Sequence, residues 1–439
     1  MSQFSLPFHP DKKIEGRFDG GSLTSDAGLL VLWTLDQQQG LSRGLAECIQ
    51  DGRDSRYVRH SFQEMICQRV HQIAAGYEDC NDADSLRTDP VFKTLCGRNP
   101  ETDPDLASQP TLSRLENGVS QKDLMRISRW LLERYLKHRK KSRPKKILLD
   151  LDSTDDPTHG QQEFTFFHGY FGSYIYHPLL VFDGETGDLV AALLRPGNQG
   201  AARHSVAVLR RIVKRIRQVL GKKIRIEIRA DSGFATPEIY EYCEQEGLTY
   251  TLGLARNPRL EAAVEDQLHQ SQLAFELQQS KQRDFTEFFY RAQSWDRSRR
   301  VVAKVEVNSL GINRRFVVTN RRDLPPAILY DQYTDRGQTE NYIKALKNDL
   351  AMDRLSCHRF LANQFRLLLH ACAYQLLLRL RDSLWGTPWR YLQIETLRRR
   401  LLKIGARVKE TSRRIWVHLA SSYPEQDLFT LLLRRLCLT

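Results

Sequence analysis

The chain of 439 residues lacks the usual marks of a membrane protein, an exported protein or a zinc ribbon. No apolar run reaches the roughly 18 residues that a spanning helix needs, and no charged segment followed by an apolar one opens the chain, so we expect a cytoplasmic protein. The eight cysteines include no C-x2-C pair, so neither a zinc ribbon nor a disulfide framework is indicated. Cys67 and Cys372 fall among helical apolar residues and should be buried. His159, His168 and His177 lack any metal-binding spacing, which favours structural roles.

What the chain has in excess is positive charge. It carries 66 Lys and Arg against 53 Asp and Glu, a net charge of +13. An ordinary basic protein could have this composition, but the clustering of the charge favours a nucleic-acid partner. The basic run KHRKKSRPKK at residues 137–146 is either a solvated linker or a phosphate contact.

One predicted helix carries a single acid among cations. In DQYTDRGQTENYIKALKNDL, Tyr333, Arg336, Lys344 and Lys347 stand at −7, −4, +4 and +7 from Glu340, which places all five on one helix face. Such a face suits a metal-binding carboxylate whose neighbours hold phosphate oxygens. Taken alone, an exposed ladder of ion pairs, each contributing about 0.2–0.5 kcal/mol, is the simpler interpretation.

Two aspartates upstream change that balance. Asp152 closes the apolar run KILLDLD, and Asp231 closes the alternating run KKIRIEIRAD, so both stand where strands leave a sheet. Ligand sites of open α/β sheets collect at such ends, and with Glu340 the two acids predict an oxygen-ligand cage for two Mg²⁺ ions. Such a pair of ions generates a hydroxide nucleophile and stabilises the leaving oxygen of a phosphodiester. Asp150 is an alternative to Asp152, because strand alternation turns both to the same face, and Asp155 and Asp156 crowd the same position.

These residues form motifs of a known group of enzymes. Asp152-Ser153-Thr154, the segment RADSGF around Asp231, and the spacing Tyr-x2-Arg-x3-Glu-x6-Lys around Glu340 resemble the Asp-Asp-Glu triad and the Tyr-Arg-Glu-Lys motif of insertion-sequence transposases. FDGGSLTSDAGLL, LDSTDDPTHG, FHGYFG and CHRFLANQFRLLLHA resemble one bacterial subfamily, so the resemblance covers nearly the whole chain. It favours Asp152 over Asp150, because Asp-Ser-Thr matches the family pattern.

The resemblance implies a fold, a chemistry and partners. Family members have a ribonuclease H-like core, use Mg²⁺ or Mn²⁺, and act as dimers that cut and rejoin double-stranded DNA at element ends. By this resemblance Asp152, Asp231 and Glu340 would be catalytic metal ligands, and Tyr333, Arg336 and Lys347 would clamp phosphates. We add Lys344 from helical geometry.

The element pattern predicts a mixed α/β fold. We expect a ribonuclease H-like mixed sheet with a β-rich insertion, preceded by an all-α N-terminal domain and followed by a helical C-terminal tail. Strands are predicted near 146–152, 163–168, 174–182, 188–195 and 224–231, with helices around 205–219 and 237–246. The predicted parts are a helical DNA-binding domain (1–140), the catalytic core (141–255 and 331–385), the insertion (256–330) and a basic helical C-terminal region (386–439).

Two further DNA contacts are predicted. In some relatives a tryptophan of the insertion stacks on a flipped base, and Trp295 is the candidate by position, although a core position is an equal alternative. Helices over 108–118 and from 121 onward, joined at Gly118, suggest a helix-turn-helix in which Arg114 reads DNA, with Gln109, Thr111, Ser113 and Asn117 as further candidates. A plain helical hairpin is the alternative, and we favour it slightly for any individual residue.

The predicted function is therefore a transposase that cuts the ends of its insertion sequence and joins them to target DNA. Two other classes compete with it: a silent transposase-derived DNA-binding protein, and a metal-dependent DNA nuclease. The intact triad argues against the first, and the insertion argues against the second. We expect a homodimer that works on the bacterial nucleoid.

Overall fold

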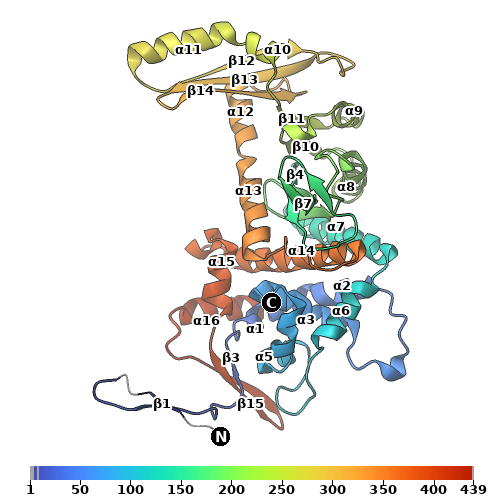
Figure 1. The fold of residues 1–439 in the computed structure, drawn as a ribbon, viewed down its shortest axis with the longest axis vertical. Helices are drawn as coiled ribbons and strands as arrows, with labels where there is room; N and C mark the ends of the chain where they lie inside the picture. Colours follow the sequence, from blue (N-terminus) through green and yellow to red (C-terminus); the bar gives the residue numbers. More distant parts are fainter. Residues whose placement is uncertain (1–3, 7–8, 438–439) are drawn as a thin grey trace. The chain divides into compact units, whose positions relative to one another are not determined.

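A computed structural model describes residues 4–6 and 9–437 of the chain, which folds into two compact units. The helical unit comprises the chain up to Ile127, Ala345–Met352 and the chain from Leu361 onward. The sheet unit comprises Ser128–Lys344 and Asp353–Phe360. Figure 1 draws the elements of both units along the chain. Among the described residues, no helix combines the length and apolar character that a bilayer crossing would require.

The sheet unit contains the strands and helices expected between 146 and 255, except that the strand predicted at 174–182 is divided into two strands, Ser173–Tyr176 and Leu179–Asp183, which belong to different sheets. Its strands are β4 (Lys146–Ser153), β5 (Asp156–Pro157), β6 (Phe166–His168), β7 (Ser173–Tyr176), β8 (Leu179–Asp183), β9 (Leu189–Leu193), β10 (Arg225–Ala230), β11 (Thr249–Leu254), β12 (Gln282–Tyr290), β13 (Arg299–Asn308) and β14 (Gly311–Thr319). Its helices are most of α7 (Gln121–Lys141), α8 (Ser205–Leu220), the 3-10 turn η3 (Ser232–Phe234), α9 (Pro237–Gln245), α10 (Pro258–Ala262), α11 (Glu265–Gln278), α12 (Pro326–Thr334) and α13 (Gly337–Lys344).

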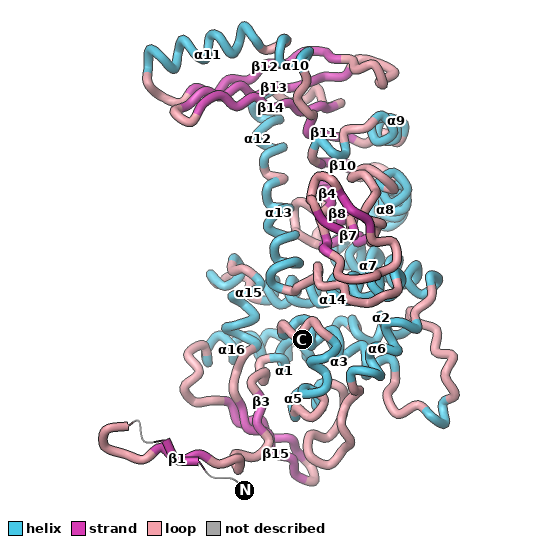
Figure 2. Tube along the Cα trace, in the orientation of Figure 1, coloured by secondary structure: helices cyan, strands magenta, loops and turns pink. Residues whose placement is uncertain are grey.

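Eight strands form one mixed sheet in the order β12-β13-β14-β11-β10-β4-β8-β9. β4, β10 and β11 are parallel, because α8 and α9 return the chain between them, whereas β8 and β9 run antiparallel to their neighbours. The inserted strands continue this sheet, since β14 pairs with β11 from Thr319 opposite Thr251 to Phe316 opposite Leu254. Figure 2 shows β12, β13 and β14 as strands, with α11 as the helix beside them. The insertion is β-rich, as predicted, but it extends the central sheet rather than forming one of its own.

The two faces of the sheet differ in chemistry because side chains alternate along each strand. Ile147, Leu149 and Leu151 of β4 join Ile226 and Ile228 of β10 in the core under α7, α8 and α9. The opposite face carries the polar residues of the same strands. Figure 1 shows α12 and α13 on one side of the sheet and α8 and α9 on the other. On the polar side, an apolar cluster joins β13, β14 and α12, where Leu329 and Tyr330 pack with Val302 and Val317.

The helical unit is built mainly from short helices. Its elements are β1 (Phe4–Leu6), β2 (Ile14–Gly16), β3 (Leu23–Thr24), α1 (Leu29–Gln39), α2 (Leu41–Glu47), η1 (Ser55–Tyr57), α3 (Phe62–Ala75), η2 (Cys80–Asp82), α4 (Ala83–Leu86), α5 (Pro90–Leu95), α6 (Gln109–Gly118), η4 (Ala345–Asp349), α14 (Phe360–Ser383), η5 (Pro388–Tyr391), α15 (Ile394–Leu397), η6 (Arg398–Leu402), β15 (Ala406–Thr411), β16 (Arg414–Leu419) and α16 (Gln426–Cys437).

Local signals explain several helix boundaries. Gly40, with φ 60°, ends α1 in the left-handed conformation. Ser120 starts α7 through a reciprocal pair of hydrogen bonds with Asp123, its amide donating at 2.8 Å and its hydroxyl accepting at 3.2 Å. Cys67 and Cys372 are buried, as expected.

The C-terminal region is not helical throughout, so that part of the predicted fold is wrong. Residues 406–419 form the hairpin β15–β16, and β15 also pairs with β3. Ala406 and Val408 are buried while Arg407 and Lys409 are exposed, a period of two that matches a strand. The many basic residues of this segment obscured that alternation, because they resemble the polar face of an amphipathic helix.

Candidate catalytic site

Asp152 and Asp231 lie side by side at the carboxyl ends of two parallel strands. The register pairs Leu151 of β4 with Ala230 of β10, so the two aspartates are the next residues of their strands. Asp152 is 7% exposed, whereas the side chain of Asp231 is 44% exposed. Asp231 accepts a hydrogen bond of 2.9 Å from the amide of Gly233, which fixes its carboxylate at the start of η3. One acid is therefore buried and the other opens toward solvent.

Arg336 lies between these two carboxylates. Its Nη2 is 2.8 Å from Oδ2 of Asp152 and 3.9 Å from Oδ2 of Asp231. The Nε of Arg336 is buried and has no hydrogen-bond partner in the described part of the chain. The guanidinium of Arg336 thus neutralises part of the charge of the two aspartates, while its Nε donates no hydrogen bond among the described residues.

Glu340 adds a third negative charge to the same region. The pKa of Asp152 is raised to about 6: burial is the largest cause, and the charges of Asp231 and Glu340 also raise it, whereas Arg336 lowers it. Glu340 itself is exposed on α13. Among the described residues, the three carboxylates do not all approach within 4.8 Å of one another. Arg336 thus pairs with the two aspartates, and Glu340 acts on Asp152 through its charge.

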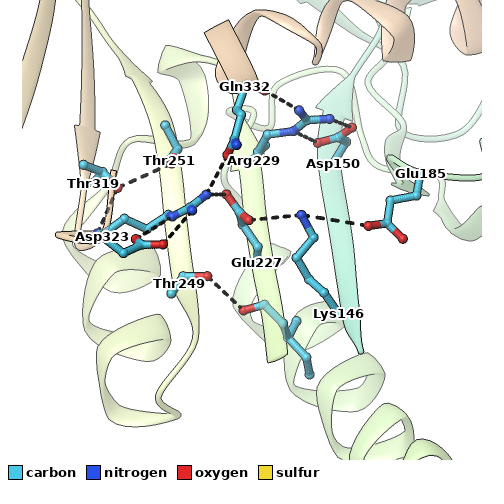
Figure 3. A network of polar contacts seen from close by, with 12 residues as sticks. Lys146, Asp150, Glu185, Glu227, Arg229, Thr249, Thr251, Thr319, Asp323 and Gln332 are labelled. Atoms are coloured by element: carbon cyan, nitrogen blue, oxygen red, sulfur yellow. Dashed lines mark hydrogen bonds and ion pairs between the residues drawn. The ribbon is translucent and has the colours of Figure 1, made fainter. Parts of the chain in front are cut away.

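A second polar layer lies on the same face of the sheet, two residues before Asp152 on β4. Asp150 is fully buried and pairs with Arg229 through two hydrogen bonds of 2.7 and 2.8 Å. Thr339 donates to the same carboxylate at 3.1 Å, and Arg229 also donates to the backbone oxygen of Gln332. Figure 3 shows the Asp150–Arg229 pair with Gln332 above it. This layer fastens α12 and α13 to β4 and β10, and so fixes Glu340, the residue after Thr339.

The layer continues along the polar face of the sheet. Glu227 of β10 accepts from Arg321 at 3.0 Å and lies 3.8 Å from Nζ of Lys146, which is 3.9 Å from Glu185 (Figure 3). Arg321 also donates at 3.0 Å to the side chain of Gln332. The strands and α12 are therefore linked by ion pairs below the three acids.

Tyr333 reaches the site across a glycine. A Cβ on Gly253 of β11 would stand 2.6 Å from the hydroxyl of Tyr333 and 2.9 Å from the amide of Ser232. Burial raises the pKa of Tyr333 against the opposing effect of Arg336, and Asp231 and Asp152 raise it further. The absence of a side chain at Gly253 thus lets the phenol lie beside the aspartates.

The donor set fits divalent metal ions. Carboxylate oxygens are the ligands that Mg²⁺ and Mn²⁺ prefer. Asp152 and Asp231 have Arg336 as their shared cation, so the pair retains a negative charge that a metal ion would neutralise. Asp150, by contrast, is fully buried and is already paired with Arg229.

Comparison with known proteins then identifies the family. The sequence model described as "Transposase DDE domain group 1" matches residues 6–439. The chain belongs to this family. It is therefore a DNA transposase, a metal-dependent enzyme that cuts and joins DNA.

Two other comparisons add little. No curated protein matches the chain. Among solved structures, the piggyBac transposase in a synaptic complex with hairpin DNA is similar at 12% identity and a TM-score of 0.44, over 86% of this chain and 80% of that chain.

The other predicted DNA contacts of the transposase lie in different places. Lys344 is exposed at the end of α13, one turn after Glu340. Lys347 follows in the π-helical turn η4, which belongs to the helical unit. Tyr333, Arg336 and Glu340 therefore belong to the sheet unit. Lys347 lies beyond the end of α13, so the single helix face predicted from the sequence does not extend to it.

Trp295 does not offer a stacking surface in this structure. It is 4% exposed, and its ring packs edge to face on Tyr240 and Tyr290 at centroid distances of 5.2 and 5.4 Å. The guanidinium carbon of Arg299 lies 5.6 Å from its ring centroid. Burial in the sheet core thus favours the alternative interpretation and corrects the expectation that Trp295 stacks on a base.

Arg114 lines a large basic cleft within the helical unit. The cleft has a volume of about 1050 Å³, and Thr111 and Arg114 of α6 stand at its wall with Tyr57. Three aspartates and five arginines line it, and the arginines are Arg53, Arg59, Arg87, Arg98 and Arg114. Arg59 and Arg114 are exposed and form no ion pair in the part of the chain that the structure describes. Arg114 bonds only to Thr111, at 3.2 Å, so its charge remains available to a ligand.

Sequence reasoning missed the residues that hold the acids in place. Arg229, Thr339 and Gly253 occupy no motif position that carries chemistry of its own. A signal was present for Arg229, because it shares the polar face of β10 with Asp231 and stands opposite Asp150 in register. For Gly253 the sequence held none, since its role depends on a helix more than seventy residues away.

Proposed function

We propose that this transposase cuts the ends of its insertion sequence and joins them to target DNA with Asp152, Asp231 and Glu340 as the ligands of two Mg²⁺ ions, for which Mn²⁺ can substitute. The observation that carries this proposal is the electrostatics of the three acids. Asp152 and Asp231 share Arg336, and the pKa of Asp152 is raised to about 6, mainly by burial and also by the charges of Asp231 and Glu340, against the opposing effect of Arg336. Such a cluster needs further positive charge to stay ionised.

The strand order supports a ribonuclease H-like core. β9, β8 and β4 form an antiparallel meander, and β10 and β11 continue from β4 as parallel strands. This arrangement places the first acid on the central strand and the second at the end of its parallel neighbour. In this proposal residues 1–140 form the DNA-binding domain, and residues 141–255 and 331–385 form the catalytic core. Residues 256–330 form the insertion, and residues 386–439 form the basic C-terminal region.

Bound metal would supply a hydroxide nucleophile and neutralise the leaving oxygen. The chain's own groups would do the rest. Arg336 would turn from the aspartates toward a phosphate oxygen, and Tyr333, Lys344 and Lys347 would hold the neighbouring phosphates. The Asp150–Arg229–Thr339 layer would keep Glu340 in register with the two strand ends during that change.

DNA ends would bind in the basic cleft of the helical unit. Its exposed arginines suit phosphate contacts, and Thr111 and Arg114 present polar groups from one helix. The partners are double-stranded DNA of the element ends and of the target, and a second copy of the chain in a homodimeric synaptic complex. With chromosomal DNA as substrate, we place the protein on the nucleoid in the bacterial cytoplasm.

The test uses DNA that contains the borders of the element that encodes the protein. Wild-type protein with Mg²⁺ should cut at the borders and yield joined products. Glu340→Ala should bind the same DNA but leave it uncut. Gln338→Ala, an exposed change on the same helix, is the matched control and should retain cleavage.

Each remaining outcome points elsewhere. Cut ends without joined product would indicate a nuclease, and binding without cleavage by the wild type would indicate a silent DNA-binding protein. Strand cleavage by Glu340→Ala in either metal would remove Glu340 from the site.

A further inference from the structure

A second cluster of metal-binding residue types lies inside the helical unit. Asp36 of α1 and Cys67 and His71 of α3 each place one possible ligand atom within 4.8 Å of the other two. Cys67 and His71 are four residues apart, so successive turns of α3 bring them to one face. The cluster is separate from the carboxylates of the sheet unit and consists of one oxygen, one sulfur and one nitrogen donor.

The ligand atoms are deeply buried and incompletely paired. Asp36 is 1% exposed and His71 is fully buried. Oδ2 of Asp36 and Nε2 of His71 have no hydrogen-bond partner in the described part of the chain. A buried polar atom without a partner costs about 1–3 kcal/mol, so two of them in one cluster call for a ligand.

The surrounding hydrogen bonds prepare the residues for a cation. Nδ1 of His71 lies 2.9 Å from the backbone oxygen of Cys67, and by donating there it keeps the lone pair of Nε2 free. Oδ1 of Asp36 accepts from the amide of Ser42 at 2.8 Å, which fixes the carboxylate while leaving Oδ2 open. Both arrangements are those that orient metal ligands from outside the coordination sphere.

A fourth donor lies next to the cluster. The side chain of Cys96 is a hydrogen-bond partner of Cys67, so a second thiol stands beside the cluster. Cys96 itself donates to the backbone oxygen of Glu64 at 3.8 Å and would have to turn toward the others.

We propose that Asp36, Cys67 and His71, with Cys96 as fourth ligand, form a structural zinc site. Borderline donors of sulfur, nitrogen and oxygen select Zn²⁺ over Mg²⁺. Tetrahedral Zn²⁺ with bonds of about 2.0–2.3 Å separates its ligand atoms by about 3.5 Å, within the observed spacing. The ion would join α1, α3 and the end of α5, and it would satisfy both unpaired atoms.

The experiment measures metal in the full-length protein. Zinc content of the purified wild type should be about one equivalent per chain. Titration of the metal-free protein with Co²⁺ should give the visible bands of tetrahedral cobalt and a near-ultraviolet thiolate-to-cobalt band. Cobalt at the carboxylates of the sheet unit cannot produce that thiolate band, so the two sites are distinguished, and Asp152→Asn should keep it.

Cys67→Ser should abolish the thiolate band, while Cys243→Ser, a change at an equally buried cysteine of the sheet unit, should leave it intact. If Cys67→Ser does not fold, the wild type alone still decides, because chelation should release the zinc and lower its Tm. A wild type that holds no zinc and gives no thiolate band overturns the proposal, and the cluster is then a buried thiolate–imidazolium pair.

Discussion

The polar face of the central sheet contains two layers of charge that differ in their balance. In the inner layer Asp150 pairs with Arg229, and Thr339 donates a hydrogen bond to the same carboxylate. In the outer layer, two residues further along β4, Asp152 shares Arg336 with Asp231 while Glu340 stands nearby. Each layer pairs an aspartate of β4 with an arginine.

This difference separates a structural carboxylate from a catalytic one. A buried acid paired one to one with arginine has no charge left to offer, whereas an acid that shares its arginine has its pKa raised and can take another cation. Each of the following changes breaks or sharpens the contrast.

Asp152→Asn should have the largest effect on activity. It removes a proposed metal ligand without changing side-chain size, so strand cleavage should fall by about 10³-fold or more, while DNA binding persists. Cleavage rates and gel-shift affinities on one DNA substrate measure this. Cleavage at near wild-type rates would move the catalytic acid to another residue.

Asp150→Asn should act on stability instead. It leaves the guanidinium of Arg229 buried without its charge partner, so the free energy of unfolding should fall by about 3–5 kcal/mol. Asp331→Asn, which breaks the exposed pair with Arg283, is the control and should cost less than about 1 kcal/mol. Chemical denaturation measures both. Equal losses in the two variants would contradict the layered interpretation.

The pH dependence of stability should differ between the wild type and Asp152→Asn. The pKa of Asp152 is raised from 3.8 to about 6 in the folded protein, so its contribution to stability is complete below about pH 4 and is lost as the pH rises through 6. Without metal, Asp152→Asn should therefore match the wild type near pH 4 and exceed it by about 3 kcal/mol at pH 7.5. A difference that is constant with pH would show that Asp152 does not titrate in this range.

Arg336→Gln should change metal affinity. The guanidinium competes for Oδ2 of Asp152 and of Asp231, so its removal should tighten Mn²⁺ binding by about tenfold, or about 1.4 kcal/mol. Cleavage should nevertheless fall, because a phosphate contact is lost. Titration calorimetry with Mn²⁺ measures the first effect, with Arg283→Gln as the control. Weaker Mn²⁺ binding by Arg336→Gln would mean that Arg336 helps to hold the metal ion rather than competing with it for the two aspartates.

The sequence predicted those parts of the fold and site that depend on local periodicity. KILLDLDS and RIEIRA alternate clearly, so β4 and β10 were placed within two residues, and α8 and α9 likewise. The hairpin β15–β16 was missed because its arginines and lysines conceal the alternation. Trp295 was undecided because an aromatic residue in a strand region can face either the core or solvent, and only the packing of Tyr240 and Tyr290 decides. The pair Cys67 and His71 showed helical spacing, but Asp36, on a different helix, could not be assigned to it from sequence.

Gly253→Ala tests the smallest feature of the outer layer. The new methyl group would meet the hydroxyl of Tyr333 at 2.6 Å and the amide of Ser232 at 2.9 Å, and the second of these is backbone that cannot turn aside. We expect a loss of about 1–3 kcal/mol in stability and a several-fold fall in cleavage, because Asp231 and Tyr333 must move apart. Gly200→Ala, where the methyl group meets nothing within 4 Å, should change neither quantity. If Gly253→Ala lowers stability but leaves the cleavage rate intact, the site tolerates displacement of Tyr333, and the role of that side chain is then confined to packing against the apolar cluster that includes Val302 of β13 and Val317 of β14.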